Sequence, residues 1–224
     1  MRRFLKTIFL VVAAVVATTA INAQDLQSQR GESQDLGEIL GHKVDHGGLI
    51  INPYPQKLFM LRSLPVDITK GVKLVGKAKS YAEELGFVKH AKKGVKLTIK
   101  FDELANEISG AYQLVINGNA IEIVADGDAG AFYAIQTLRQ IVESPISAEG
   151  KLPAMSISDW PDLKYRGVVE GFYGEPWSHE TRLSLIDFYG RFKMNYYIYG
   201  PKDDPYHSSP YWREEYPAEE AEDI

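Results

Sequence analysis

Between residues 49 and 143 the hydrophobic and polar positions follow two different periods. VKLTIKF (95–101) alternates, and AYQLVINGNAIEIVA (111–125) holds two similar runs around Asn117-Gly118. Because this dipeptide tolerates the positive φ angles of a tight turn, we predict a β-hairpin there. Apolar side chains in residues 128–144 instead recur at helical spacing. An amphipathic helix, with Asp128 suited to cap it, should therefore pack on the sheet.

Other segments complete a small domain over residues 49–162. LIINPYPQKLFML (49–61) predicts an extended start, and VKLVGK (72–77) predicts a short strand. SYAEELGFVKHAKKG (80–94) predicts a helix whose apolar face holds Tyr81, Leu85 and Val88. Residues 144–162 contain three prolines and are predicted to be a connector. Together these segments predict an α+β domain, with one helix over a small, mostly antiparallel sheet.

The pattern changes at Tyr165. RGVVEGFYG and MNYYIYGPKDDPYH each predict a strand that runs into a loop, and the helix predicted between them has Ser178 as its N-cap. The adjacent apolar residues Val168 and Val169 predict a strand buried on both faces. Apolar residues on two stripes likewise predict a helix packed on two sides. This is one βαβ unit, and Pro217 opens what resembles another helix.

One βαβ unit cannot bury both faces of a parallel sheet. A complete (β/α)8 barrel takes about 250 residues, and the chain from Tyr165 to Ile224 is far shorter. We therefore expect the sequence to be an N-terminal fragment of a longer protein.

The first residues have the features of an export signal. Arg2, Arg3 and Lys6 precede an apolar run that is too short to span a membrane, and small residues follow it up to Ala23. We predict that residues 1–23 are a signal peptide and that the mature chain is periplasmic or secreted. An uncleaved membrane anchor is the alternative.

Residues 24–48 are polar and predict a flexible leader. His42 and His46 would share one face of a helix, as a metal pair requires, but the surrounding glycines disfavour a helix. We therefore interpret both histidines as solvated and predict no metal site.

Composition excludes several functions. The formal charge of −5 implies no nucleic-acid partner. The absence of cysteine excludes a disulfide framework, a thiolate metal site and a cysteine nucleophile. Apart from the signal, no segment is apolar enough to insert stably into a membrane.

The candidate chemistry lies where the two predicted strands of the βαβ unit end. Asp203 and Asp204 could form a carboxylate pair for acid/base chemistry, or one or both could be structural loop acids. Neighbouring residues on an extended chain point in opposite directions, so the two need not face one pocket. Glu170 ends the first strand and could pair with Arg166 or Lys202. Lys202 is also a donor suited to sugar hydroxyls or to an anionic group.

These strings carry a family resemblance. RGVVEGFYGEPWSHETRL and KMNYYIYGPKDDPYHSSPYWR resemble the opening of the catalytic barrel of glycoside hydrolase family 84. That family comprises retaining β-N-acetylglucosaminidases, including O-GlcNAcase-like enzymes and enzymes described as hyaluronidases. Upstream, INPYPQ, the hairpin and GAFYAIQTLRQ resemble the α+β domain that precedes the barrel in this family and in family 20 hexosaminidases. The resemblance covers residues 49–224 and implies that residues 163–224 begin a TIM (β/α)8 barrel, truncated after about two strands.

The resemblance also implies a mechanism and a set of site residues. In the family the 2-acetamido oxygen of the substrate attacks the anomeric carbon to give an oxazoline, assisted by an Asp-Asp pair at the end of the fourth barrel strand. That pair would lie beyond Ile224, so no catalytic residue is expected here, and the fragment should be inactive. Gly171, Tyr173, Lys202 and Asp203 match sugar-binding positions. The implied partner is a glycan or glycoprotein bearing N-acetylglucosamine (GlcNAc), and no cofactor is implied.

Two other interpretations stay open. The chain could be a non-catalytic carbohydrate-binding or adhesion protein, or a remnant of an enzyme. It could also be a fragment of a family 20 hexosaminidase, although the GFYGEPW and PKDDPYH strings disfavour that family.

Overall fold

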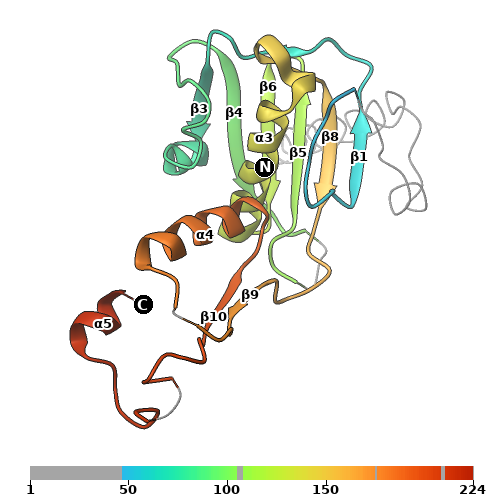
Figure 1. The fold of residues 1–224 in the computed structure, drawn as a ribbon. Helices are drawn as coiled ribbons and strands as arrows, with labels where there is room; N and C mark the ends of the chain where they lie inside the picture. Colours follow the sequence, from blue (N-terminus) through green and yellow to red (C-terminus); the bar gives the residue numbers. More distant parts are fainter. Residues whose placement is uncertain (1–46, 105–107, 175, 208–209, 224) are drawn as a thin grey trace, which may run out of the picture.

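The computed structural model describes residues 47–104, 108–174, 176–207 and 210–223. They form a sheet domain with one long helix, and a smaller βαβ unit that extends from one end of it (Figure 1). The predicted signal peptide, most of the predicted leader, and His42 with His46 lie outside the described residues.

The main sheet has six strands. In spatial order these are β1 (Lys57–Met60), β8 (Met155–Asp159), β5 (Tyr112–Asn117), β6 (Ala120–Ala125), β4 (Val95–Phe101) and β3 (Val72–Gly76). The pairs from β1 to β6 are antiparallel, and the pairs β6–β4 and β4–β3 are parallel. The mostly antiparallel α+β domain predicted from the sequence is therefore confirmed. Two short strands, β2 (Val66–Asp67) and β7 (Lys151–Leu152), pair separately, and β7 follows the 3-10 helix η2 (Pro145–Gly150).

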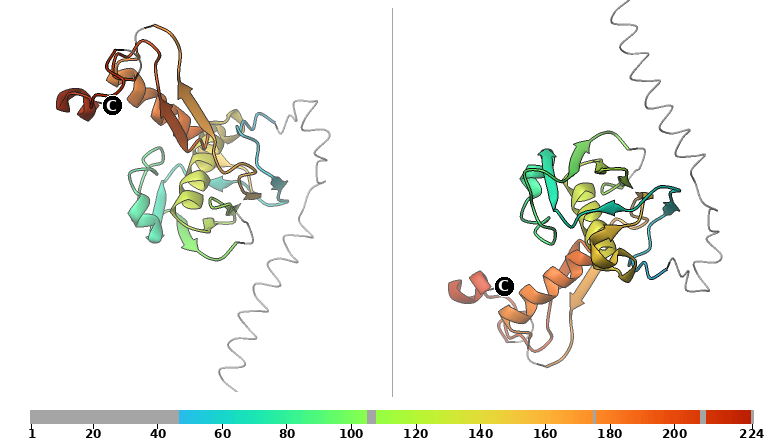
Figure 2. Two further views of the ribbon diagram at one scale, coloured as in Figure 1. Left: turned by 90° about the horizontal axis from the view of Figure 1, so that it is seen from below. Right: turned by 90° about the horizontal axis from the view of Figure 1, so that it is seen from above.

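Helix α3 (Asp128–Glu143) covers one face of the sheet, as Figures 1 and 2 show. The alternation of the strands places Leu97, Leu114 and Ile123 in the core, and all three are fully buried. On α3 itself, Ile135 and Leu138 are also fully buried. Each such side chain contributes about 1.5–3 kcal/mol on leaving water, so this two-layer contact is the main source of stability in the domain.

The predicted hairpin is confirmed, with its turn displaced by one residue. Asn117 still pairs with Ala120, so Gly118 and Asn119 are the two residues of the turn. Gly118 has a φ of 59°, whereas Asn119 is not among the residues with positive φ. A positive φ at the first central position alone is the pattern of a type II′ turn, which favours glycine there.

Two sequence-based assignments were wrong. Residues 80–94 are not an α-helix: the 3-10 helix η1 (Lys77–Tyr81) is followed by turns, although Tyr81, Leu85 and Val88 are buried as expected. Because β3 and β4 are parallel neighbours, residues 77–94 form the crossover that returns the chain to the start of β4. Here that crossover consists of a 3-10 helix and turns rather than the α-helix that is usual in such a connection. The predicted connector contains a true strand, β8, which lies between β1 and β5.

The predicted cap of α3 was also wrong. Gly127 occupies the N-cap position, and no side chain caps the helix there. Asp128 instead accepts a hydrogen bond from the hydroxyl of Tyr81. The first turn of α3 is thereby tied to the last residue of η1.

The βαβ unit consists of β9 (Gly167–Glu170), α4 (His179–Arg191) and β10 (Tyr196–Tyr199), and α5 (Ala218–Asp223) follows it. The two strands are parallel, with Gly167 opposite Tyr196. A side chain at Gly167 would overlap the carbonyl oxygen of Tyr196, so glycine is required at this contact. Ser178 caps α4 as predicted, because its hydroxyl accepts from the Thr181 N–H at 3.3 Å.

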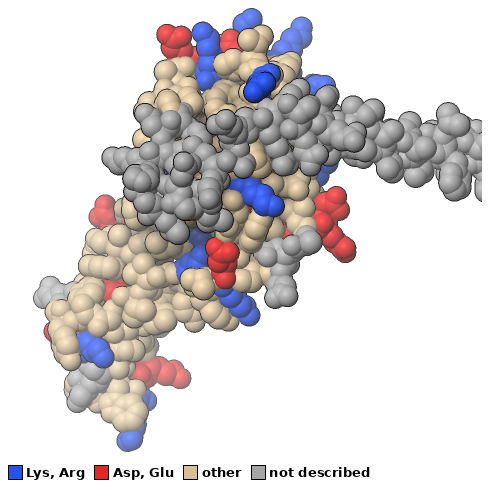
Figure 3. Space-filling model, turned by 90° about the vertical axis from the view of Figure 1, so that its right-hand side faces the viewer, with Lys and Arg blue, Asp and Glu red and all other residues tan. Residues whose placement is uncertain are grey.

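Within the described chain, only one face of the β9–β10 pair is covered. Val169 is 59% exposed and Ile198 is 43% exposed, and Leu183 and Phe188 of α4 are also exposed. The predictions of a doubly buried strand and of a helix packed on two sides are therefore wrong for these residues. On the face drawn in Figure 3 the lobe that this unit forms is largely uncharged.

A buried ion pair joins the βαβ unit to the sheet domain. Lys193, between α4 and β10, places its Nζ 2.8 Å from Asp159 Oδ2 and 2.9 Å from the hydroxyl of Tyr112. Burial lowers the pKa of Lys193, and the Asp159 carboxylate offsets part of that shift. Nearby, Arg166 donates to the hydroxyl of Tyr133 at 2.9 Å. These contacts fix the start of both strands of the unit against the sheet and α3.

Candidate functional site

The candidate site lies at the carboxyl ends of β9 and β10, where parallel strands commonly carry binding groups. The loops that leave the two strands are hydrogen-bonded to each other through their backbones. The N–H of Gly200 donates to the carbonyl of Glu170, and that of Lys202 to the carbonyl of Phe172, both at 2.9 Å. Backbone pairing thus continues past the strands and holds residues 171–174 beside residues 200–204.

The four residues predicted to bind sugar all lie on these two joined loops. Asp203 links the loops directly, because its Oδ2 accepts from the N–H of Gly174 at 2.6 Å. Tyr173 is 80% exposed, and Lys202 is also exposed. Gly171 is half-buried, and a Cβ there would meet the Val169 side chain at 3.1 Å. The loops therefore present an ammonium group, a carboxylate and an aromatic ring, with backbone accessible near Gly171.

Asp204 is oriented differently from its neighbour. It is 6% exposed, and its Oδ1 accepts from the N–H groups of Tyr206 and His207 at 2.8 and 3.1 Å. Its Oδ2 accepts from the hydroxyl of Tyr199 at 2.6 Å. Burial alone would raise the pKa of Asp204, but these hydrogen bonds outweigh it and the pKa is lowered. Asp203 and Asp204 do not form a carboxylate pair, and Asp204 is a structural loop acid.

Glu170 pairs with neither of the residues that the sequence suggested. Its Oε2 lies 3.0 Å from Nε of Arg182 on α4 and also accepts from the hydroxyl of Tyr197. Its Oε1 accepts from the N–H of Trp177 at 2.9 Å, which positions the chain just before α4. Burial raises the pKa of this carboxyl, yet the three hydrogen bonds dominate and lower it.

Arg182 is the residue that the sequence analysis missed. Besides its ion pair with Glu170, its guanidinium lies 4.5 Å from the ring centroid of Tyr199, whose hydroxyl binds Asp204. One arginine thus connects the end of β9 with the loop after β10. The sequence did contain a hint of this role. Arg182 is a charged residue on a helix that was predicted to be buried on two sides, and a buried charge needs a partner of opposite sign.

The arrangement is suited to binding rather than to proton transfer. Glu170 and Asp204 are both held ionised by their hydrogen bonds, so neither is matched to donate a proton near neutral pH. Over the described ranges, no group of three potential ligands is placed to hold a metal ion. None of the described helices combines the length and apolarity needed to cross a membrane.

Two protein-family models match the chain, and each of them matches a different part of it. Residues 50–160 match the model "Glycosyl hydrolase family 20, domain 2". Residues 166–224 match the model "beta-N-acetylglucosaminidase". The sheet domain and the βαβ unit thus each resemble a part of hexosaminidase-type glycoside hydrolases.

Individual relatives agree with this class. The chain is 33% identical over 141 residues to N,N'-diacetylchitobiase of Vibrio harveyi, covering 58% of this chain and 16% of that protein. It is 50% identical over 58 residues to protein O-GlcNAcase of Rattus norvegicus, covering 26% of this chain and 6% of that protein. The solved structure of CpGH84B has a TM-score of 0.65 and 34% identity, covering 78% of this chain and 34% of that one. The chain therefore resembles the N-terminal portion of family 84 glycoside hydrolases, as its motifs indicated, and spans only a small part of its relatives' length.

Proposed function

We propose that this chain is the N-terminal portion of a β-N-acetylglucosaminidase of the family 84 type. Residues 49–162 form its accessory α+β domain, and residues 163–224 begin its (β/α)8 barrel. The substrate is a glycan or glycoprotein that ends in β-linked GlcNAc. An N-terminal signal over residues 1–23 directs the protein to the periplasm or out of the cell.

One observation supports this proposal most strongly. The parallel strands β9 and β10 end side by side, and Asp203 ties their two loops together through the Gly174 N–H. In a (β/α)8 barrel the carboxyl ends of the strands carry the substrate site. The motif that matches the N-acetylglucosaminidase family lies on these strands and loops.

Each site residue has a role that follows from its chemistry. Lys202 donates hydrogen bonds to sugar hydroxyls, and Asp203 holds the two loops in register while its carboxylate accepts from the sugar. Gly171 lets the sugar ring of the substrate approach the backbone, since no side chain intervenes there. Tyr173 shapes the edge of the pocket with its exposed ring.

The reaction proposed is retaining and substrate-assisted, an exception to the usual two-carboxylate scheme of glycosidases. The 2-acetamido oxygen of the substrate displaces the leaving group and forms an oxazoline, which water then opens. The acid/base pair for these steps comes from a later strand of the barrel. The 224-residue chain alone is therefore inactive.

The test begins at the gene. Resequencing should show whether coding continues past Ile224 and supplies an Asp-Asp pair after a fourth hydrophobic strand. The extended protein should release GlcNAc from an aryl β-N-acetylglucosaminide, and the 224-residue chain should not. A lack of hydrolysis by the extended protein, or hydrolysis by the 224-residue chain, would refute the proposal.

Variants of the extended enzyme test the site residues. Lys202→Ala should lower kcat/KM about tenfold or more, as expected for the loss of a charged hydrogen bond to substrate. Lys164→Ala, an exposed lysine outside the loops, is the matched control and should leave kcat/KM unchanged. Equal values for the two variants would exclude Lys202 from the site.

A further inference from the structure

The positive charge of the chain is concentrated in one segment of the sheet domain. Residues 70–100 contain nine lysines and two glutamates, a formal charge of +7, although the whole chain carries −5. This lysine-rich segment includes β3, η1 with its turns, and almost all of β4. Its strand β3 is the outermost strand on one side of the main sheet (Figure 1). A charge asymmetry of this size favours an anionic partner for this side of the sheet.

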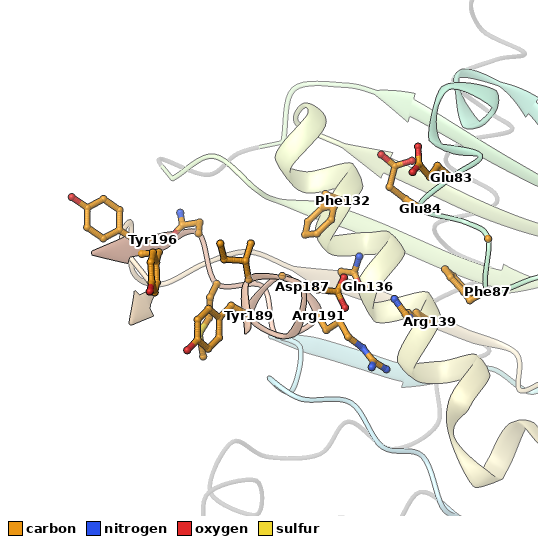
Figure 4. Close-up of a pocket in the computed structure, with 16 residues that line it drawn as sticks. Glu83, Glu84, Phe87, Phe132, Gln136, Arg139, Asp187, Tyr189, Arg191 and Tyr196 are labelled. Atoms are coloured by element: carbon orange, nitrogen blue, oxygen red, sulfur yellow. The ribbon is translucent and has the colours of Figure 1, made fainter. Parts of the chain in front are cut away.

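The two glutamates of the lysine-rich segment do not pair with its lysines. Glu83 and Glu84 line a separate groove, between α3, the turns after η1 and α4 (Figure 4). No described lysine lines that groove. The lysines of the segment make no ion pair with any described residue. Their charge is therefore available to a ligand in the part of the chain that the structure describes.

A hollow beside β3 collects part of this charge. It has a volume of about 540 Å³ and is lined by β3 and residues 90–92. Lys73, His90 and Lys92 line it with three apolar residues, and no carboxylate of the described chain does. These three residues are all exposed. An anionic group in the hollow would meet two ammonium groups and an imidazole.

The backbone of β3 adds a donor to the same hollow. Val72 donates to the carbonyl of Lys89 and accepts from the N–H of Ala91, both at 2.8 Å, so its backbone groups point away from β4. Alternate residues of a strand share this direction, and the N–H of Leu74, which also lines the hollow, therefore points outward. No described residue accepts from this N–H. Unpaired groups at a sheet edge are open to a ligand.

Two lysines on the exposed face of β3 and β4 repel each other. Lys73 and Lys96 are direct partners in the parallel register, and Lys100 lies on the same face of β4. Like charges directly opposite each other destabilise a sheet. Glu122 of β6, which lies on this face opposite Thr98, forms no ion pair with them. A bound anion would remove the repulsion that the described chain leaves in place.

We propose that the lysine-rich segment binds an anionic polysaccharide. One sulfate or carboxylate group enters the hollow between Lys73 and Lys92 and accepts from the N–H of Leu74. Further anionic groups lie along Lys96 and Lys100. None of the four proposed sugar-binding residues belongs to this segment, so this is a second site, on the accessory domain.

The rest of the exposed sheet face favours a polysaccharide over other polyanions. Beyond β4 this face carries uncharged polar side chains that suit sugar hydroxyls, and the register places Gln113, Ser156 and Ser158 there. The strands β3 to β6 are described in full and place no aromatic side chain on this face. Single-stranded nucleic acids are bound by stacking on aromatic rings, and membrane surfaces by large apolar anchors. The choice also rests on the proposed function, because an exported glycosidase meets polysaccharides.

The test uses the 224-residue chain and three fluorescently labelled oligosaccharides, namely a sulfated heparin fragment, an unsulfated polyuronate and neutral dextran. Fluorescence anisotropy measures their affinity for the wild-type chain and for Lys73→Glu/Lys92→Glu. The control Lys57→Glu/Lys164→Glu changes the net charge equally, at exposed lysines outside the lysine-rich segment. Glutamate at position 73 would face Lys96 as an opposite charge, so urea denaturation should show no loss of stability. Weaker binding then cannot be attributed to unfolding.

We expect the wild-type chain to bind the sulfated or the polyuronate oligosaccharide, and the one that binds identifies the anionic group. The Lys73→Glu/Lys92→Glu variant should weaken binding about tenfold or more, the control should stay close to wild type, and binding should weaken as salt rises.

The proposal would be overturned if neither anionic oligosaccharide bound, if dextran bound equally well, or if the two double variants lost affinity equally. Tighter binding to a DNA duplex or to vesicles of anionic lipid, with the same dependence on Lys73 and Lys92, would also overturn it, because the partner would then be of another class. Oligosaccharide binding does not require hydrolysis. Failure of the proposed enzymatic function would therefore leave this result intact.

Discussion

The buried ion pair between Lys193 and Asp159 should be a major source of cohesion between the two parts of the chain. Replacing Lys193 with Met removes the ammonium group but keeps a side chain of similar length. Lys193 is 5% exposed and Asp159 is 8% exposed, so the carboxylate would remain buried without its cation. Removing one partner of a buried ion pair costs about 3–5 kcal/mol.

Two other donors limit the expected loss. Asp159 Oδ2 still accepts from the hydroxyl of Tyr112 at 2.8 Å, and Oδ1 from the N–H of Gln56 at 3.2 Å. We therefore expect Lys193→Met to lower the free energy of unfolding by about 3 kcal/mol, the lower end of that range. This loss in the free energy of unfolding is measured by urea denaturation, with unfolding monitored by far-UV circular dichroism and by tryptophan fluorescence. Trp177 and Trp212 report on the βαβ unit and on the segment that follows it.

A matched control and a double-mutant cycle separate the ion pair from general effects of the substitution. Lys93→Met replaces an exposed lysine and should change stability by less than about 0.5 kcal/mol. Asp159→Asn, alone and with Lys193→Met, should reveal a coupling of about 1 kcal/mol or more. If Lys193→Met behaves like the control, or if the coupling is zero, the ion pair does not hold the two parts together.

Three further predictions concern the strand-end region. The pKa of Glu170 is lower in the folded chain than in the unfolded chain. The ionised carboxylate therefore contributes to the free energy of unfolding above its unfolded pKa of about 4.3, and this contribution is lost as pH falls through the folded pKa. Glu170→Gln should therefore flatten the fall in stability in acid titrations, and an unchanged slope would contradict this. Gly167→Ala should destabilise the chain by about 3 kcal/mol through overlap with the Tyr196 carbonyl, whereas Gly127→Ala, which meets nothing within 4 Å, should be nearly neutral by the same measurement. Arg182→Lys keeps the charge but not the planar contact with Tyr199, so we expect a loss of about 1 kcal/mol and a changed near-UV circular dichroism spectrum; a wild-type spectrum would argue against the connecting role of Arg182.

Local pattern in the sequence was enough for most of the secondary structure. The alternation in residues 95–101 and 111–125 predicted β4, β5 and β6, and helical spacing predicted α3. Ser178 marked the start of α4, because an N-cap is a contact between neighbours in sequence. The strings around Gly171 and Lys202 were distinctive enough to indicate the family before any fold was known.

Two features depended on residues far away in the sequence: the place of β8 in the main sheet, and the structure of the connection between β3 and β4. Met155 and Ile157 alternate with polar residues, yet β8 became a strand only because β1 and β5 flank it. Residues 80–94 have helical spacing, yet the crossover between β3 and β4 folds as a 3-10 helix and turns, and the hydroxyl of Tyr81 in it binds Asp128 of α3. In both cases the deciding contacts join segments far apart along the chain, and periodicity carries no information about them.

The sequence by itself determined most of the periodic elements, the Ser178 cap of α4 and the family motifs, because each of these is local. Only the tertiary structure decided the partners of the buried charges. Glu170 is bound by Arg182 and Asp159 by Lys193, and Asp204 turns inward while Asp203 bridges two loops. A buried carboxylate must find a donor among the groups that packing brings near it, and packing joins residues whose distance along the sequence says nothing of their distance in space.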